Sequence, residues 1–155
     1  NGTSKKDIDI LWVNNFRPFK RPETVINIAN KLKEYKIVMI GGPCAGHEEY
    51  FTEVVNKLRR IRNIDFLGPI PYSKINKYFE KANIFINTSE IEGFPNSFLQ
   101  AWIRRVPVIS FFDPDNIIKK NHFGIVPLNE TEMINAIKKI LKNEITYYIT
   151  TYSCY

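Results

Sequence analysis

Six short runs of apolar residues recur along the chain, and each has the length of a buried strand. The runs are continuous rather than alternating, which is typical of strands that are covered on both faces of a sheet. They cover residues 8–13, 37–40, 64–67, 84–87, 106–111 and 124–126. We therefore predict six strands at these positions.

Between these runs, apolar residues repeat at the spacing of an amphipathic helix. The repeats are Val25/Ile28/Ala29/Leu32, Phe51/Val54/Val55/Leu58, Ile75/Tyr78/Phe79/Ala82 and Ile134/Ile137/Ile140/Leu141, the last within a helix predicted over residues 130–142. Strands that alternate with helices predict the α/β class, a three-layer Rossmann-like parallel sheet with helices on both faces. Ligands of such sheets bind beyond the carboxyl ends of the strands.

The segment from Asn87 to Trp102 is the most informative part of the sequence. After the fourth strand comes a polar turn with Glu92 and Gly93 at its tip, and we expect a helix that opens at Pro95, where proline is well tolerated. The amides of the first helical turn, from Asn96, Ser97 and Phe98, then form an anion site. Glu92 supplies hydroxyl acceptors in front of that site, as a sugar joined to a diphosphate requires.

This segment resembles the donor-site signature of the family 4 retaining glycosyltransferases, whose GT-B fold has two facing Rossmann-like domains. Other parts resemble that family's nucleotide-sugar half in the same order: residues 10–23 its first strand and basic loop, residues 37–42 its second strand and glycine turn, and residues 65–71 its third strand. The resemblance covers residues 8–145. It implies the donor-binding half of a metal-independent hexosyltransferase that uses a UDP- or GDP-hexose in polysaccharide or glycolipid synthesis.

The resemblance also implies roles for individual residues. Glu92, with the backbone of Gly93, Phe94, Pro95 and Asn96, would hold the hydroxyls of the donor sugar, and Ser97 and Phe98 would offer amides to phosphate. Lys20 and Arg17 would stabilise the leaving diphosphate. Gly42 belongs to the glycine turn near the donor, and the backbone of Gly68 and Ile70 would face the nucleobase.

Two positions depart from the family pattern. Gln100 stands where a second glutamate commonly binds ribose, and an amide cannot supply a charge-assisted pair there. The usual spacing would put the basic loop's arginine at position 15, where this chain has Asn15, so Arg17 is the nearest cation. On the predicted helix, Asn96 and Gln100 share a face, while Phe98, Leu99, Trp102 and Ile103 are expected on the core side.

No metal or cofactor is expected. The run from Gly41 to Glu48 has two spaced glycines, but His47 and Glu48 replace the Lys and Ser/Thr of a phosphate-binding P-loop. His47 and His122 also lack partners at metal-ligand spacing. The run Asp113-Pro114-Asp115 favours a turn with a helix cap over a pair of catalytic acids.

The composition adds limits on partners and location. With 155 residues and 44% hydrophobic residues, one domain with a sizeable core is expected. The net charge of +6 is scattered in short clusters, so we expect no nucleic-acid partner, but peripheral contact with an acidic membrane surface fits it. Two cysteines and a polar start favour the cytoplasm, at or near the inner membrane surface.

The chain does not start with Met, and we expect it to be a fragment. An N-terminal domain that binds the acceptor glycan or lipid-linked sugar would precede it, so this fragment should bind donor but hardly transfer sugar. For residues 146–155 propensity allows a strand, whereas the resemblance favours a truncated C-terminal helix. Two alternatives stay open: another GT-B activity, such as a nucleotide-sugar epimerase or a phosphorylase, and a non-catalytic nucleotide-sugar-binding module.

Overall fold

The apolar runs pair into a single parallel sheet. The computed structural model describes residues 5–145 of the chain. Its strands are β1 (Ile8–Val13), β2 (Ile37–Ile40), β3 (Ile64–Phe66), β4 (Ala82–Asn87), β5 (Val108–Ser110) and β6 (Gly124–Ile125). The six predicted strands are therefore all present, with β3, β5 and β6 shorter than their apolar runs.

The order of the strands creates a switch point in the middle of the sheet. The order is β3-β2-β1-β4-β5-β6, and every pair is parallel. The chain runs outward from β1 to β3, then returns to place β4 on the other side of β1. In such a sheet a crevice forms outside the carboxyl ends of the two central strands. The candidate site lies beyond the ends of β1 and β4, as their topology predicts.

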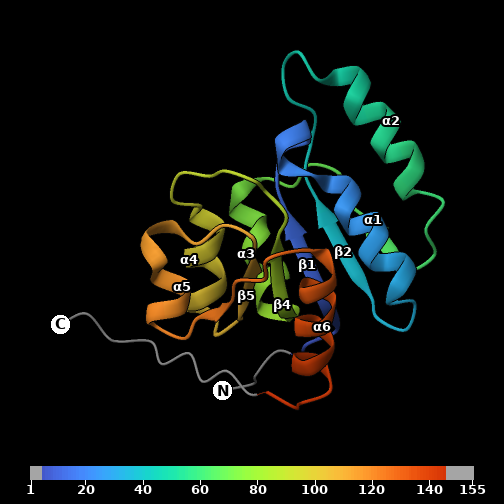
Figure 1. Ribbon diagram of the computed structural model, residues 1–155. Helices are drawn as coiled ribbons and strands as arrows, with labels where there is room; N and C mark the ends of the chain where they lie inside the picture. The colour runs from blue at the N-terminus through green and yellow to red at the C-terminus, as the bar shows by residue number, and fades with distance from the viewer. Residues whose placement is uncertain (1–4, 146–155) are drawn as a thin grey trace.

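Helices cover both faces of this sheet (Figure 1). They are α1 (Pro22–Lys31), α2 (Glu48–Leu58), α3 (Tyr72–Lys81), α4 (Asn96–Ile103), α5 (Ile117–Lys120) and α6 (Glu130–Leu141), with short 3-10 helices at Pro18–Lys20 and Pro114–Asn116. Side chains alternate between two cores: Ile10 and Trp12 pack under α1, α2 and α6, whereas Leu11 packs under α3, α4 and α5. The predicted three-layer Rossmann-like architecture is confirmed.

Three local predictions were wrong. Ala82 was expected on the apolar face of the helix that contains Ile75 and Phe79. It begins β4 instead and pairs with Ile8, because α3 ends at Lys81. Pro95 is the extended residue that precedes α4 rather than its first helical residue. Leu99 and Ile103, expected on the core side of α4, are 45% and 66% exposed, because α4 presents only Phe98, Ala101 and Trp102 to the core.

The loop after β5 is a cap, as predicted. The Asp113 carboxylate accepts the amide hydrogens of Ile118 and Lys119, at 2.8 and 3.3 Å, which satisfies donors at the start of α5. Asp113 therefore has a structural role at this helix end.

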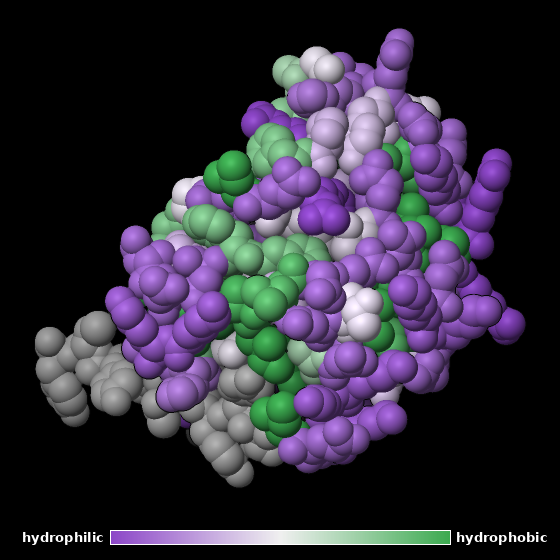
Figure 2. Space-filling model, viewed as in Figure 1, coloured by the Kyte–Doolittle hydropathy of each residue, from purple (hydrophilic) through white to green (hydrophobic). Residues whose placement is uncertain are grey.

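The surface of the described residues is mixed. Figure 2 shows a band of hydrophobic side chains between α5 and α6, with polar residues on both sides of it. The connection between these helices contains the edge strand β6 and Leu128, which is 83% exposed. Within residues 5–145, no helix is long and apolar enough to cross a bilayer. The predicted helix or strand over residues 146–155 lies outside the described residues.

Candidate functional site

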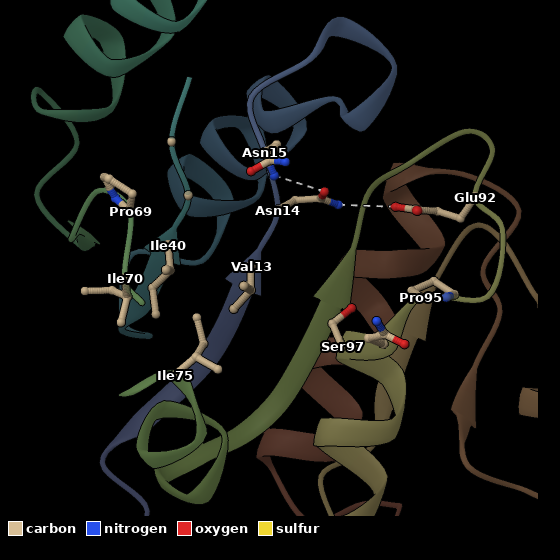
Figure 3. Close-up of a pocket in the computed structure, with 13 residues that line it drawn as sticks. Val13, Asn14, Asn15, Ile40, Pro69, Ile70, Ile75, Glu92, Pro95 and Ser97 are labelled. Carbon is tan, nitrogen blue, oxygen red and sulfur yellow. Dashed lines mark hydrogen bonds between the residues drawn. The ribbon is translucent and has the colours of Figure 1, made fainter. Parts of the chain in front are cut away.

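A cleft of about 440 Å³ lies at the carboxyl ends of the central strands (Figure 3). One wall is apolar and comes from β1, β2, the loop after β3 and α3. The other wall is polar and comes from the loop after β4 and the start of α4. The lining residues are Val13, Asn14, Asn15, Ile40, Gly41, Gly42, Pro69, Ile70, Ile75, Glu92, Pro95, Asn96 and Ser97. Such a division suits a ligand with a flat ring at one end and charged or hydroxylated groups at the other.

Glu92 is the centre of the polar wall. Its Oε1 accepts hydrogen bonds from Lys20 Nζ at 2.5 Å, Ser89 Oγ at 2.7 Å and Asn14 Nδ2 at 3.3 Å. The side chains of Lys20 and Glu92 are each only 13% exposed, so their ion pair is largely shielded from solvent. Residues more than 70 positions apart in the sequence are thereby brought together.

These contacts keep Glu92 ionised. Burial alone would raise the pKa of the Glu92 carboxyl, because the charged form loses solvent. The hydrogen bonds from Lys20, Ser89 and Asn14, together with the Lys20 charge, outweigh that effect and hold the pKa below its ordinary value. A carboxylate of this kind accepts hydroxyl hydrogens and is poorly suited to donate a proton at neutral pH.

The two loops that carry Lys20 and Glu92 are joined by hydrogen bonds. Trp12 Nε1 donates to Thr88 Oγ1 at 3.0 Å, and Thr88 Oγ1 in turn donates to the Lys20 carbonyl at 2.6 Å. The Glu90 amide donates to the Phe19 carbonyl at 3.1 Å. Thr88 and Ser89 are fully buried. These hydrogen bonds fix the two loops relative to each other, so the backbone positions of Lys20 and Glu92 are set independently of their ion pair.

The start of α4 presents amide groups to the same cleft. Asn96 and Ser97 line it, and within residues 5–145 no backbone acceptor pairs with their amides. The amide of Phe98, which we expected to bind phosphate, already donates to the Pro95 carbonyl at 3.0 Å, and the Phe98 side chain is buried in the core. The predicted anion site thus reduces to the first two helical amides.

The other predicted residues divide into two groups. Gly42, Ile70 and Pro95 line the cleft together with Glu92, Asn96 and Ser97. Outside the lining lie Gly68, whose carbonyl accepts the Gly41 amide, and Gly93 and Phe94, both exposed at the tip of the loop.

Gln100 and Arg17 also lie outside the lining. Gln100 Nε2 donates to Asn76 Oδ1 on α3 at 3.3 Å. Arg17 Nε lies 2.8 Å from the Cys44 sulfur, and neither Arg17 nor Lys20 is among the lining residues, so the two do not form the expected basic pair at the cleft.

Sequence reasoning missed Asn14 as a contact of Glu92, and it treated Asn15 only as a missing arginine. Both residues directly follow β1, so the end of a central strand was the signal that could have identified them. Their polar side chains line the cleft beside Gly41 and Gly42 from the end of β2.

Comparison with known proteins identifies the family. Residues 1–151 match the family model described as "Glycosyl transferases group 1". The O-antigen biosynthesis glycosyltransferase WbnH of Escherichia coli is 26% identical over 102 residues, which cover 64% of this chain and 27% of WbnH. The chain thus spans about a quarter of that relative.

Solved structures show the same fold. The C-terminal domain of a group 1 glycosyl transferase (LpcC) from Francisella tularensis superimposes with a TM-score of 0.71 at 19% identity, covering 88% of this chain and 76% of that one. Anabaena HepE, solved with UDP, gives a TM-score of 0.74 at 17% identity, covering 90% of this chain and 40% of that one. The chain belongs to the glycosyl transferases group 1, and its sheet is a Rossmann-like domain of the GT-B type.

Proposed function

We propose that this chain is the nucleotide-sugar-binding half of a retaining, metal-independent hexosyltransferase of family 4. The observation that carries the proposal is the arrangement of the polar wall. One ionised carboxylate, Glu92, shares a cleft with the two amides that open α4, which have no backbone acceptor within residues 5–145. Hydroxyl acceptors at one end and phosphate donors at the other match the chemistry of a sugar joined to a diphosphate.

Each part of the cleft then has a role in binding. The apolar wall of Val13, Ile40, Ile70 and Ile75 would face the nucleoside. The amides of Asn96 and Ser97 would bind the diphosphate, and Lys20 would stabilise its growing charge as the glycosyl bond breaks. Glu92 would accept hydroxyl hydrogens of the hexose. The role of Arg17 as a second cation stays a sequence prediction, since Arg17 contacts Cys44 instead.

The nucleotide is proposed to be UDP. The HepE domain that superimposes on this chain was solved with UDP and also with UDP-glucose. Uridine nucleotides are therefore the first probes to use, with GDP as the second.

We further propose that the parent protein contains an acceptor-binding domain. The chain spans 27% of WbnH and 40% of HepE, so most of each relative lies outside the matched part. A glycan or lipid-linked sugar would bind there, and O-antigen synthesis by WbnH favours polysaccharide products. We place this reaction at the cytoplasmic side of the inner membrane, in line with the basic surface of the chain.

The first test is thermal stabilisation by UDP in the presence of EDTA. At a UDP concentration of about 100 Kd, binding should stabilise the fold by about 2.7 kcal/mol, because only the folded state binds. For a chain of this size that corresponds to a rise in Tm of roughly 5–10 °C. Differential scanning fluorimetry measures it. A rise that requires Mg²⁺ or Mn²⁺ would contradict the metal-independent part of the proposal.

Glu92→Gln tests the proposed contact between Glu92 and the sugar. It keeps the shape of the side chain and removes the charge, so affinity for UDP should change little. Affinity for the best-bound nucleotide sugar should fall by about 1.5–3 kcal/mol, since a charged hydrogen bond to the sugar is lost. Titration calorimetry with both ligands separates these outcomes. Equal affinity of the variant and the wild type for the nucleotide sugar would show that Glu92 does not bind the hexose.

A further inference from the structure

Asn14 is the first residue after the central strand β1, and its backbone is tightly fixed. Its amide donates to the Ile40 carbonyl at 3.1 Å, which extends the pairing of β1 with β2 by one residue. Gly41, the next residue after Ile40, is equally close: a Cβ there would lie only 1.8 Å from the Asn14 carbonyl oxygen. The backbone of Asn14 therefore has little room to move, and its side chain projects from a rigid position.

The orientation of the Asn14 amide is set by its own turn. The Asn15 backbone amide donates to Asn14 Oδ1 at 3.1 Å, which identifies the oxygen end of the side chain. The nitrogen end then faces Ser89 Oγ and Glu92 Oε1, each 3.3 Å from Nδ2. Figure 3 shows the bond to Glu92. A flipped amide would place two acceptors against each other at Glu92 and would lose the bond to Asn15.

All three donors to Glu92 reach the same oxygen. Lys20, Ser89 and Asn14 donate to Oε1, and within residues 5–145 Oε2 has no hydrogen-bond donor. Lys20 and Asn14 approach from the loop after β1, whereas Ser89 belongs to the loop of Glu92 itself. A carboxylate fixed through one oxygen in this way keeps the other oxygen available as an acceptor in the cleft.

We propose that Asn14 is a positioning residue for Glu92: its amide fixes Oε1 so that Oε2 is presented to a hydroxyl of the bound sugar. The proposal rests on the proposed function for the identity of the ligand, but the contact between Asn14 and Glu92 can be tested without any ligand. The end of β1 would then contribute to binding of the sugar through Asn14, as well as to binding of the nucleoside through Val13.

Two substitutions distinguish positioning from a purely structural role in the turn. Asn14→Ala removes both the donor to Glu92 and the acceptor for the Asn15 amide. Asn14→Asp retains the acceptor but removes the donor and adds a charge beside Glu92. If Asn14 only forms the turn, Asn14→Asp should have the same Glu92 pKa and sugar-nucleotide affinity as the wild type, and only Asn14→Ala should differ. If Asn14 positions Glu92, Asn14→Asp should change the Glu92 pKa more than Asn14→Ala does.

The ligand-free test is a titration of Glu92 by carbon-detected NMR. If Asn14 holds the carboxylate, the pKa of Glu92 should rise in Asn14→Ala and rise further in Asn14→Asp, because a donor is lost and then a like charge is added. Lys20 faces the same oxygen and is unchanged in both variants. Asn83→Ala is the control. Asn83 donates to the Ile8 carbonyl at the opposite end of the strands, so this substitution should leave the pKa of Glu92 unchanged.

The ligand test uses UDP and UDP-glucose, with UDP-galactose, UDP-N-acetylglucosamine and GDP-mannose as further probes. Asn14→Ala should bind the best of these sugar nucleotides roughly tenfold more weakly, while its affinity for UDP stays close to that of the wild type. An unchanged Glu92 pKa in both variants would overturn the proposal, and so would a shifted pKa with unchanged sugar-nucleotide affinity. If the wild type binds none of the probes, the proposed function fails, and the titration alone decides whether Asn14 positions Glu92.

Discussion

At the scale of single residues, the cleft is dominated by one carboxylate and its donors. Lys20 and Glu92 neutralise each other, so the polar wall carries little net charge of its own. If the proposed function is correct, a diphosphate would contact the amides of Asn96 and Ser97 in the lining and would share with Glu92 the ammonium group of Lys20, which lies outside the lining. This sharing is possible because Lys20 has three donor hydrogens, of which Glu92 takes one.

The first prediction concerns the stability of the fold at low pH. The folded state lowers the pKa of Glu92 from an ordinary value of about 4.5, so Glu92 contributes stability above that pH. This contribution is lost as the pH falls through the lower, folded-state pKa. Urea unfolding from pH 7 to pH 3 should therefore show that the free energy of unfolding is higher for the wild type than for Glu92→Gln, and that this difference becomes smaller as the pH falls.

The exposed Glu34 provides a control for that measurement. Glu34→Gln removes a carboxylate without breaking any ion pair among the described residues, so its small effect should not follow the same pH course. A gap for Glu92→Gln that stays constant over the whole pH range would mean that the Lys20–Glu92 pair does not stabilise the fold.

The sequence predicted the centre of this cleft better than its rim. Glu92, Asn96 and Ser97 follow a recognisable pattern at the end of β4, and they line the cleft. Contacts of Arg17 with Cys44 and of Gln100 with Asn76 could not be predicted, because they depend on which rotamer a long side chain adopts between neighbouring loops or helices. Spacing along the chain contains no information about that choice.

At the scale of elements, the apolar periodicity identified all six strands and the main helices. Its errors occur at the boundaries, where apolar character and hydrogen bonding disagree. Ala82 suits the apolar face of α3, and its amide still donates to the Phe79 carbonyl, but its backbone is extended and it pairs with Ile8 of β1. Only three residues of the run 106–111 belong to β5, which pairs with β4 and the two-residue β6.

The second prediction concerns the contact between the ends of β1 and β2. Gly41→Ala would place a methyl group 1.8 Å from the Asn14 carbonyl oxygen, and neither backbone can move without breaking strand pairing. We expect a loss of about 3 kcal/mol or more in the free energy of unfolding. Gly93→Ala is the matched control, because a Cβ there meets no atom within 4 Å, and it should cost less than about 0.5 kcal/mol.

Chemical unfolding of the two glycine variants provides the measurement. Similar stabilities for Gly41→Ala and Gly93→Ala would mean that the strand ends can separate, and the rigid position assigned to Asn14 would then be incorrect.

The third prediction concerns the start of α6. The N-cap residue Asn129 accepts the Glu132 amide at Oδ1, at 2.9 Å, and Glu132 Oε2 accepts the amide of the preceding residue, Leu128, at 2.7 Å. Asn129→Ala should therefore destabilise the fold by about 1 kcal/mol. The same substitution at the exposed Asn135 inside α6 should be neutral or slightly stabilising, because alanine has the higher helix propensity. A loss of equal size at both positions would argue against the cap.

At the scale of the whole molecule, the cleft is assembled from parts that are distant in the sequence. The ends of β1 and β2, the loop after β3 and the start of α4 each contribute, from Val13 to Ser97. No one of these segments could bind the proposed ligand alone. Ligand binding should therefore stabilise the whole described fold and not just one loop.

The fourth prediction concerns activity. Because we place the acceptor site in a domain outside this chain, the chain should bind UDP-sugars without releasing UDP from them beyond the uncatalysed rate. A luminescent assay for free UDP measures this directly. Release of UDP that disappears in Glu92→Gln would show that the chain catalyses bond cleavage by itself, and the division of work between two domains would have to be abandoned.

The central position of β1 has a consequence for how the protein is made. Ile10 pairs with Ile37 on one side and with Ile84 on the other, so one edge of this apolar strand must wait for a partner synthesised more than 70 residues later. While the ribosome is producing α2, β3 and α3, that edge is exposed on the nascent chain, where it can pair with other chains. We therefore expect the chain to be most prone to aggregation in the interval before β4 has been synthesised.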